Sequence, residues 1–122
     1  MRQVWITRHG GPEVLELREA PDPQPRPGEV RIRVRAAGVN FADVMTRVGL
    51  YPDAPPLPCV VGYEVSGEID LPVERAGQRV LAMTRFGGYS DTVCVPTPLV
   101  QPIPDGLSFA EAASIPVNWL TA

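Results

Sequence analysis

The sequence predicts a mainly β domain, a partly open barrel or sandwich, on three observations. Short β-prone runs recur along the 122 residues, turns rich in glycine and proline separate them, and only brief segments have helical spacing. A chain of this length is expected to form one domain with its own core. We therefore expect residues 1–122 to be a single domain with two or three short helices.

The chain is predicted to begin with a β hairpin. Residues 3–7 and 14–20 are β-prone and flank a His-Gly-Gly-Pro turn. Four prolines within residues 20–28 predict an extended surface connection, because proline fixes the backbone and lacks an N–H donor. Residues 29–39 then alternate apolar side chains with three arginines. This alternation predicts a half-buried antiparallel strand with a solvated arginine face.

Two helices are predicted later in the chain. Residues 41–48 carry apolar side chains at helical spacing, and Gly49 is a natural stop. Ser108 and Glu111 have the spacing of a capping box, so a second helix is expected to begin there.

Further strands are expected between these helices. The β-prone runs are residues 56–69, 78–83, 87–95 and 98–103. Gly87-Gly88 has the composition of a hairpin turn.

Composition excludes several classes of function. The net charge is −3, and the eleven basic residues are all arginine, which indicates neither a nucleic-acid nor a polybasic membrane partner. No run approaches the ~18 apolar residues of a membrane-spanning helix. Cys59 and Cys94 are too few for a disulfide framework, and both are interpreted as small core residues. We expect a cytoplasmic protein.

Five segments together resemble a known family. They are "GVNFADVMTRVGLYP", "PLPCVVGYEVSG", "GQRVLA", "GGYSDTVCVP" and "IPDGLSFAEAASIPVNWLTA". In this order and spacing they resemble the medium-chain dehydrogenase/reductase superfamily, in particular its zinc-independent quinone oxidoreductases and the branch containing vesicle amine transport protein. The resemblance implies a GroES-like partly open β-barrel that serves as the catalytic domain.

In that family a Rossmann domain that binds NADP(H) follows the barrel. This chain contains no G-x-G-x-x-G turn for a dinucleotide phosphate. The resemblance therefore implies that the nucleotide-binding half is absent from this chain and that the chain is inactive as a fragment.

The resemblance also implies a metal-free site. Zinc-dependent members have a catalytic cysteine and histidine at the positions of Asn40 and Tyr63, and a catalytic zinc needs three protein ligands. Asp43 and Glu64 remain, but the family uses these carboxylates structurally. We expect Asp43 to be a buried acceptor and Glu64 to hold backbone or an arginine such as Arg79.

Hydride delivery to a carbonyl without a metal requires hydrogen-bond donors for the oxygen that gains charge. Asn40 and Tyr51 offer such donors near the two ends of one predicted helix. By the resemblance, Asn40 lines the nicotinamide pocket, Tyr51 lies at the mouth of the substrate site and Thr121 touches the cofactor. The sequence leaves plainer roles open: Asn40 as a helix N-cap, Tyr51 as a turn anchor and Thr121 as an ordinary helix residue.

The leading hypothesis is the catalytic part of an NADPH-dependent oxidoreductase that reduces quinones or α,β-unsaturated carbonyls, with a possible homodimer in the full-length enzyme. Two alternatives stay open. One is a stand-alone GroES-like binding or interaction module without catalysis. The other is the enoyl-reductase domain of a polyketide or fatty-acid synthase. Trp119 and Leu120 are interpreted as interdomain packing residues.

Overall fold

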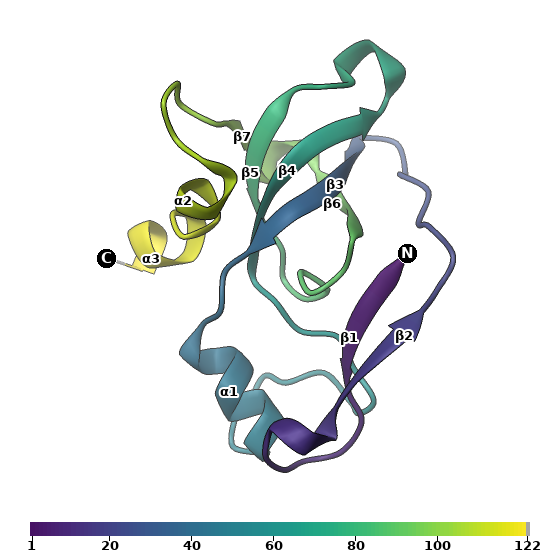
Figure 1. Cartoon of the computed structure of the whole chain (residues 1–122), viewed down its shortest axis with the longest axis vertical. Helices are drawn as coiled ribbons and strands as arrows, with labels where there is room; N and C mark the ends of the chain where they lie inside the picture. Colours follow the sequence, from purple (N-terminus) through teal and green to yellow (C-terminus); the bar gives the residue numbers. More distant parts are fainter. Residues whose placement is uncertain (122) are drawn as a thin grey trace.

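A computed structural model describes the backbone of residues 1–121 and the side chains of residues 1–118. Figure 1 shows a curled sheet with the helices at its margins. The strands are β1 (Arg2–Ile6), β2 (Leu15–Glu19), β3 (Glu29–Ala37), β4 (Glu64–Leu71), β5 (Arg79–Met83), β6 (Thr92–Pro96) and β7 (Val100–Pro102). The α-helices are α1 (Phe41–Val48), α2 (Phe109–Ala113) and α3 (Pro116–Thr121), and three 3-10 turns are η1 (Pro12–Val14), η2 (Val73–Arg75) and η3 (Thr97–Leu99).

The strands form two antiparallel sheets. Strands β1 and β2 pair as the predicted hairpin, and the other five lie in the order β6-β3-β4-β5-β7. Isolated bridges from Gln3 to Ser90 and from Ile6 to Cys59 attach the hairpin to the rest of the domain. The predicted mainly β, partly open barrel with short helices is confirmed.

The interior of the curled sheet is apolar. Its largest cluster joins inward-facing side chains of β3 through β7: Val30, Ile32, Val65, Ile69, Val80, Ala82, Val93, Val95 and Val100. Every second residue of a strand faces the same side, so the alternation in residues 29–39 delivers Val30 and Ile32 to this core. Burial of these aliphatic side chains stabilises the domain, at about 1.5–3 kcal/mol for each fully buried one.

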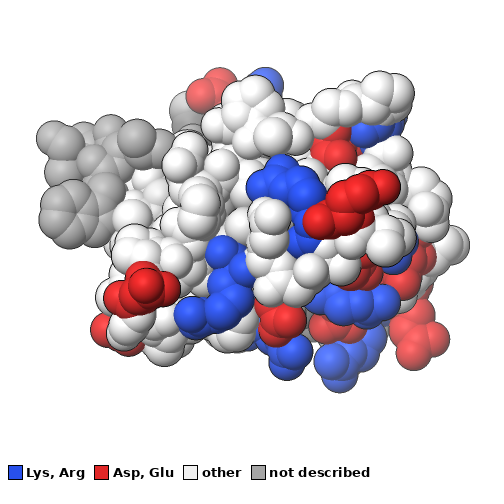
Figure 2. Space-filling model, turned by 90° about the horizontal axis from the view of Figure 1, so that it is seen from above, with Lys and Arg blue, Asp and Glu red and all other residues white. Residues whose placement is uncertain are grey.

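The arginine face of β3 is paired with carboxylates. Arg31 contacts Asp70 at 2.8 Å, Arg33 contacts the same carboxylate at 3.0 Å, and Arg35 contacts Glu68 at 3.1 Å. The side chain of Arg31 is only 12% exposed, so the prediction of a solvated face is wrong at this residue. Acidic and basic side chains also interleave on the surface drawn in Figure 2.

Helix α1 forms where the apolar spacing predicts it. Gly49 ends it with a φ of 88°, a left-handed conformation that glycine adopts without strain. Most of its apolar side chains stay out of the core, however: Phe41 is 76% exposed, Val44 and Val48 are also exposed, and Met45 is half-buried. The helical spacing therefore predicts the helix correctly but does not indicate a buried face.

The C-terminal helices lie beside the five-stranded sheet, on the side away from the β1–β2 hairpin (Figure 1). Helix α2 begins with the predicted capping box, in which the hydroxyl of Ser108 accepts the N–H of Glu111 and the carboxylate of Glu111 accepts the N–H of Ser108. The helix ends after five residues, and Pro116 begins α3. No helix within residues 1–121 combines the length and apolarity needed to cross a bilayer.

The predicted hairpin at Gly87-Gly88 is wrong. Strand β5 pairs with β4 and β7, whereas β6 pairs with β3, so the strands on either side of this turn are not neighbours. The turn instead crosses the barrel to meet Val60–Gly62, where Gly87 donates its N–H to the Val60 carbonyl and Gly88 donates to Gly62. Local turn composition cannot tell a hairpin from such a crossing.

Candidate functional site

Asn40 is the N-cap of α1, and its side chain reaches across to β4. The Asp43 carboxylate accepts the backbone N–H of Asn40 at 3.0 Å, which is part of a capping box. The Asn40 amide nitrogen donates to Glu64 Oε1 at 3.0 Å. Asn40 therefore caps α1 and also binds Glu64 in β4. The second N–H of the amide makes no hydrogen bond to a described residue, so one donor is left for a ligand.

Glu64 is a buried carboxylate that joins three parts of the fold. It is 1% exposed, and besides Asn40 it accepts the backbone N–H of Val117 in α3 at 2.9 Å. A buried carboxylate needs such partners, because an unpaired charge in the interior is costly. Of the two alternatives predicted for Glu64, backbone or an arginine such as Arg79, the structure confirms backbone. Arg79 instead donates to the carbonyl of Leu107.

Asp43 extends this network toward Tyr89. Its side chain is 4% exposed, and Oδ2 accepts the Tyr89 hydroxyl at 2.6 Å in addition to the Asn40 N–H. The predicted role of Asp43 as a buried structural acceptor is confirmed. Burial is the main cause that raises the pKa of Tyr89, followed by the bond to Asp43, so this phenol stays protonated at neutral pH and continues to donate.

Tyr51 lies three residues beyond the end of α1 and packs on Tyr63. Their ring centroids are 6.4 Å apart with the planes at 72°, an edge-to-face contact, and the ring of Phe86 lies 5.7 Å from Tyr63 on another side. The carbonyl of Tyr51 also accepts the N–H of Ala54 at 3.2 Å, which closes a turn. Tyr51 is thus a turn residue whose half-buried side chain contributes to an aromatic cluster.

The segment Gly62-Tyr63-Glu64 brings the two predicted donors to one place. Asn40 binds Glu64 and Tyr51 packs on Tyr63, so residues at opposite ends of α1 meet adjacent residues of one segment. Gly62 fixes this segment: it has a φ of 118°, and a Cβ there would lie 2.8 Å from the backbone of Gly88. Only glycine permits this conformation and this close approach.

The third predicted site residue, Thr121, has a side chain outside the described residues, as do Trp119 and Leu120 with their predicted interdomain role. Sequence reasoning did not assign a site role to Tyr63 or Tyr89. The signals for Tyr63 were its place beside Glu64 in "GYE" and its position at the catalytic histidine of zinc-dependent members. Nothing local indicated that Tyr89 would reach a carboxylate 46 residues away.

The described part of the chain contains no group of three or more histidine, cysteine, aspartate or glutamate side chains placed to hold a metal ion. Cys59 is buried and Cys94 is half-buried, and burial raises the pKa of both thiols. A raised thiol pKa lowers the fraction of reactive thiolate. These cysteines therefore fit the packing role predicted for them.

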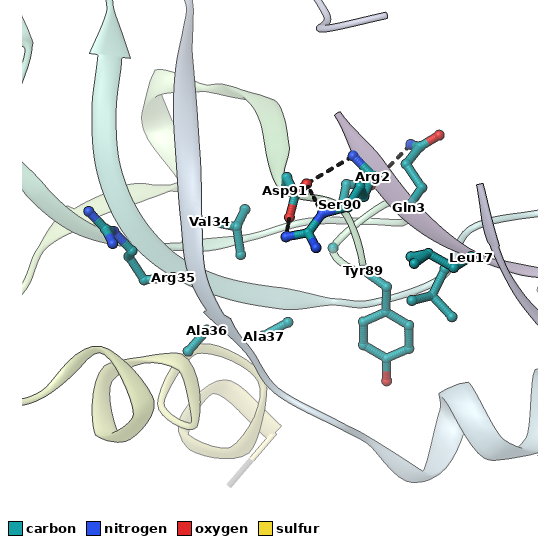
Figure 3. A pocket seen from close by; sticks show the side chains of 12 residues that line it. Arg2, Gln3, Leu17, Val34, Arg35, Ala36, Ala37, Tyr89, Ser90 and Asp91 are labelled. Atoms are coloured by element: carbon teal, nitrogen blue, oxygen red, sulfur yellow. Dashed lines mark hydrogen bonds and ion pairs between the residues drawn. The ribbon is translucent and has the colours of Figure 1, made fainter. Parts of the chain in front are cut away.

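A separate hollow of about 380 Å³ lies between β1 and β3 (Figure 3). Arg2 and Arg35 both line it, but Arg2 is paired with Asp91 at 2.9 Å and Arg35 with Glu68. In Figure 3 the ring of Tyr89 extends away from the Arg2–Asp91 pair, with its hydroxyl at the far end. Both cations are already neutralised, so we place the functional site at the Asn40–Glu64 network instead.

The fold and this network define a class of protein. A family model of the alcohol dehydrogenase GroES-like domain matches residues 26–105. The chain belongs to this family, within the medium-chain dehydrogenase/reductase superfamily that its motifs resemble.

Individual relatives agree with this assignment. The chain is 39% identical to mouse "Synaptic vesicle membrane protein VAT-1 homolog-like", with 100% of the chain and 30% of the relative covered. It is 38% identical to a quinone oxidoreductase of Pseudomonas aeruginosa, with 98% of the chain and 38% of the relative covered. The quinone oxidoreductase of Thermus thermophilus, whose structure was also determined in complex with NADPH, superposes with a TM-score of 0.86 at 40% identity, over 99% of this chain and 38% of that one. The chain thus spans about a third of the length of these proteins.

Proposed function

We propose that this chain forms the catalytic barrel of an NADPH-dependent oxidoreductase that reduces quinones or α,β-unsaturated carbonyls, in a reaction that needs no zinc. The observation that carries the proposal is the convergence of Asn40 and Tyr51 on Tyr63-Glu64, in a domain that aligns over nearly its whole length with a quinone oxidoreductase crystallised with NADPH. A cytoplasmic location and a homodimer of the complete enzyme belong to the same proposal.

The side chains at the site fit the nicotinamide end of such a cofactor and a carbonyl substrate beside it. Asn40 keeps one amide N–H without a described partner, and Tyr63 has a buried hydroxyl without one. A site with polar groups left unpaired suits a ligand that brings oxygen atoms. Asn40 would contact the nicotinamide and ribose end, and Tyr51 would contact the substrate.

NADPH, when bound, supplies the hydride. The chain's own residues supply position and hydrogen bonds. The Glu64 carboxylate holds the Asn40 amide in one orientation, and the Tyr51 hydroxyl donates to the substrate oxygen as negative charge builds on it. The apolar edges of the aromatic cluster of Tyr51, Tyr63 and Phe86 exclude water from one side of that oxygen.

The test uses the polypeptide encoded by the complete reading frame that contains this chain. We expect it to oxidise NADPH, followed by absorbance, when a quinone or an enone is added. Tyr51→Phe should lower kcat by about tenfold to a hundredfold, because a donor to the developing oxyanion is lost. Glu74→Gln, at an exposed residue of η2, is the matched control and should leave the rate unchanged.

Three results would contradict the proposal or a part of it. Absence of NADPH oxidation with both substrate types would favour the binding-module alternative. Full activity of Tyr51→Phe, with activity otherwise present, would remove the role assigned to Tyr51. Metal content measured on the active protein tests the zinc-free part of the proposal, and activity that is lost on chelation and restored by zinc would refute it.

A further inference from the structure

Tyr63 carries a buried hydroxyl with no use in the fold itself. Its oxygen is shut off from solvent and has no hydrogen-bond partner among the described residues. A buried hydroxyl that gives up water without gaining a partner destabilises the folded state, so such groups are uncommon. Phenylalanine would fill the same space without this cost. The hydroxyl therefore needs an explanation other than packing.

The backbone of Tyr63 is held firmly on one side. The Tyr63 carbonyl accepts the N–H of Thr84 at 2.8 Å, and the Thr84 hydroxyl donates to the carbonyl of Gly62 at 2.6 Å. The ring of Phe86 packs beside it. Tyr63 thus presents its hydroxyl from a fixed position.

Tyr51 is the phenol that lies next to this fixed hydroxyl. It belongs to the loop after α1, a turn closed by a single backbone bond to Ala54, and its ring meets that of Tyr63 edge to face. The Tyr63 hydroxyl forms no hydrogen bond to Tyr51 in this structure, and the centroids of the two rings are 6.4 Å apart. Catalytic hydrogen bonds are often long before substrate binds, and a small movement of this loop would close the gap.

We propose that Tyr63 is a positioning residue whose hydroxyl donates to the oxygen of Tyr51, so that Tyr51 directs its own proton to the substrate carbonyl oxygen. This inference rests on the proposed function and extends it to a residue that the family resemblance left without a role. A phenol that accepts one hydrogen bond becomes a better donor of its own, because bonds in a chain polarise one another.

The protonation of Tyr63 agrees with this direction of donation. Burial in the first place, and Tyr51 in the second, raise the pKa of Tyr63 above that of a free phenol. Tyr63 therefore keeps its proton at neutral pH.

The test is a double-mutant cycle of Tyr51→Phe and Tyr63→Phe in the polypeptide from the complete reading frame. Both changes keep the rings and remove only hydroxyl groups. We expect Tyr63→Phe to lower kcat for a quinone about three- to tenfold with little change in KM, and to have no further effect when Tyr51 is already phenylalanine. The melting temperature of Tyr63→Phe should equal or exceed that of the unchanged protein, since an unpaired buried hydroxyl is removed.

Tyr89→Phe is the matched control for the stability measurement. Tyr89 is the other tyrosine with a deeply placed hydroxyl, but that hydroxyl is bonded to Asp43. Its removal should lower the melting temperature. If Tyr63→Phe lowers the melting temperature as much, the Tyr63 hydroxyl has a structural partner and the proposal is wrong. If the two effects in the cycle on kcat multiply independently, Tyr63 does not act through Tyr51, and the proposal is also wrong.

A readout without catalysis separates this inference from the proposed function. In the 122-residue chain with a quinone added, NMR should show a slowly exchanging Tyr63 hydroxyl proton with a nuclear Overhauser effect to the Tyr51 ring, lost in Tyr51→Phe. Presence of this signal, with no NADPH oxidation by the polypeptide from the complete reading frame, would support the pairing and refute the reductase function. Absence of the signal from an active protein would refute the pairing alone, and absence of both would refute both.

Discussion

Replacement of Glu64 by glutamine tests the network that joins α1, β4 and α3. The carboxylate accepts two hydrogen bonds, from the Asn40 amide and from the Val117 N–H, at 3.0 and 2.9 Å. Glutamine has nearly the same shape but only one oxygen, so one of the two N–H groups must face an N–H of the new amide. A buried hydrogen bond to a charged group contributes about 1.5–3 kcal/mol, and removal of the buried charge offsets part of its loss. We expect the free energy of unfolding to fall by about 2 kcal/mol.

This value converts into a shift of the melting temperature. With an unfolding entropy of about 2.1 cal/mol/K per residue, the 122-residue chain has roughly 0.26 kcal/mol/K in total, so a loss of about 2 kcal/mol lowers the melting temperature by about 8 °C. Calorimetry measures the shift, and amide exchange of Val117 shows whether the start of α3 has loosened.

The control is Glu74→Gln, which removes an exposed carboxylate from η2. It should change the unfolding free energy by less than about 0.5 kcal/mol. Equal melting temperatures for Glu64→Gln and Glu74→Gln would show that the Glu64 contacts contribute nothing measurable, and our account of the network would then fail.

Three further predictions concern other parts of the fold. Gly62→Ala should destabilise the chain by about 2–4 kcal/mol in denaturant unfolding, because a Cβ would press on the backbone of Gly88. Gly28 has a φ of 84° but open space around it, so Gly28→Ala should cost only about 1 kcal/mol. Equal losses of stability in the two variants would contradict the close approach of Gly62 to Gly88. The pKa of Tyr89 is higher in the folded than in the unfolded chain, so the stabilising contribution of Tyr89 is complete below about pH 10, the unfolded value, and is lost at higher pH. Above about pH 10 the stability of Tyr89→Phe should therefore fall less steeply than that of the unchanged protein. Parallel curves of stability against pH for the two proteins would refute this. Phe41→Gln should change stability by less than about 0.5 kcal/mol, since its side chain is 76% exposed; a large loss would mean that this residue packs in the core.

The site itself was only partly predictable from the sequence. Asn40 and Tyr51 could be chosen because a short helix with a clear stop separates them and because the motifs resemble a known family. The contact of Asn40 with Glu64 joins residues 24 apart in sequence, and the contact of Tyr89 with Asp43 joins residues 46 apart. No local pattern records such distances. The hydrogen bonds of the site could therefore be assigned only from the three-dimensional structure, in which the sheet brings these residues together.

The sequence alone determined the local structure: the alternation that buries Val30 and Ile32, the glycine that ends α1 and the capping box at Ser108. These features depend on neighbours within a few residues, whose geometry the backbone fixes. Only the tertiary structure decided the strand order, the exposure of the apolar face of α1 and the unpaired hydroxyl of Tyr63. Each of these features depends on contacts between segments that are far apart in the sequence, and the packing of the whole sheet determines which segments meet.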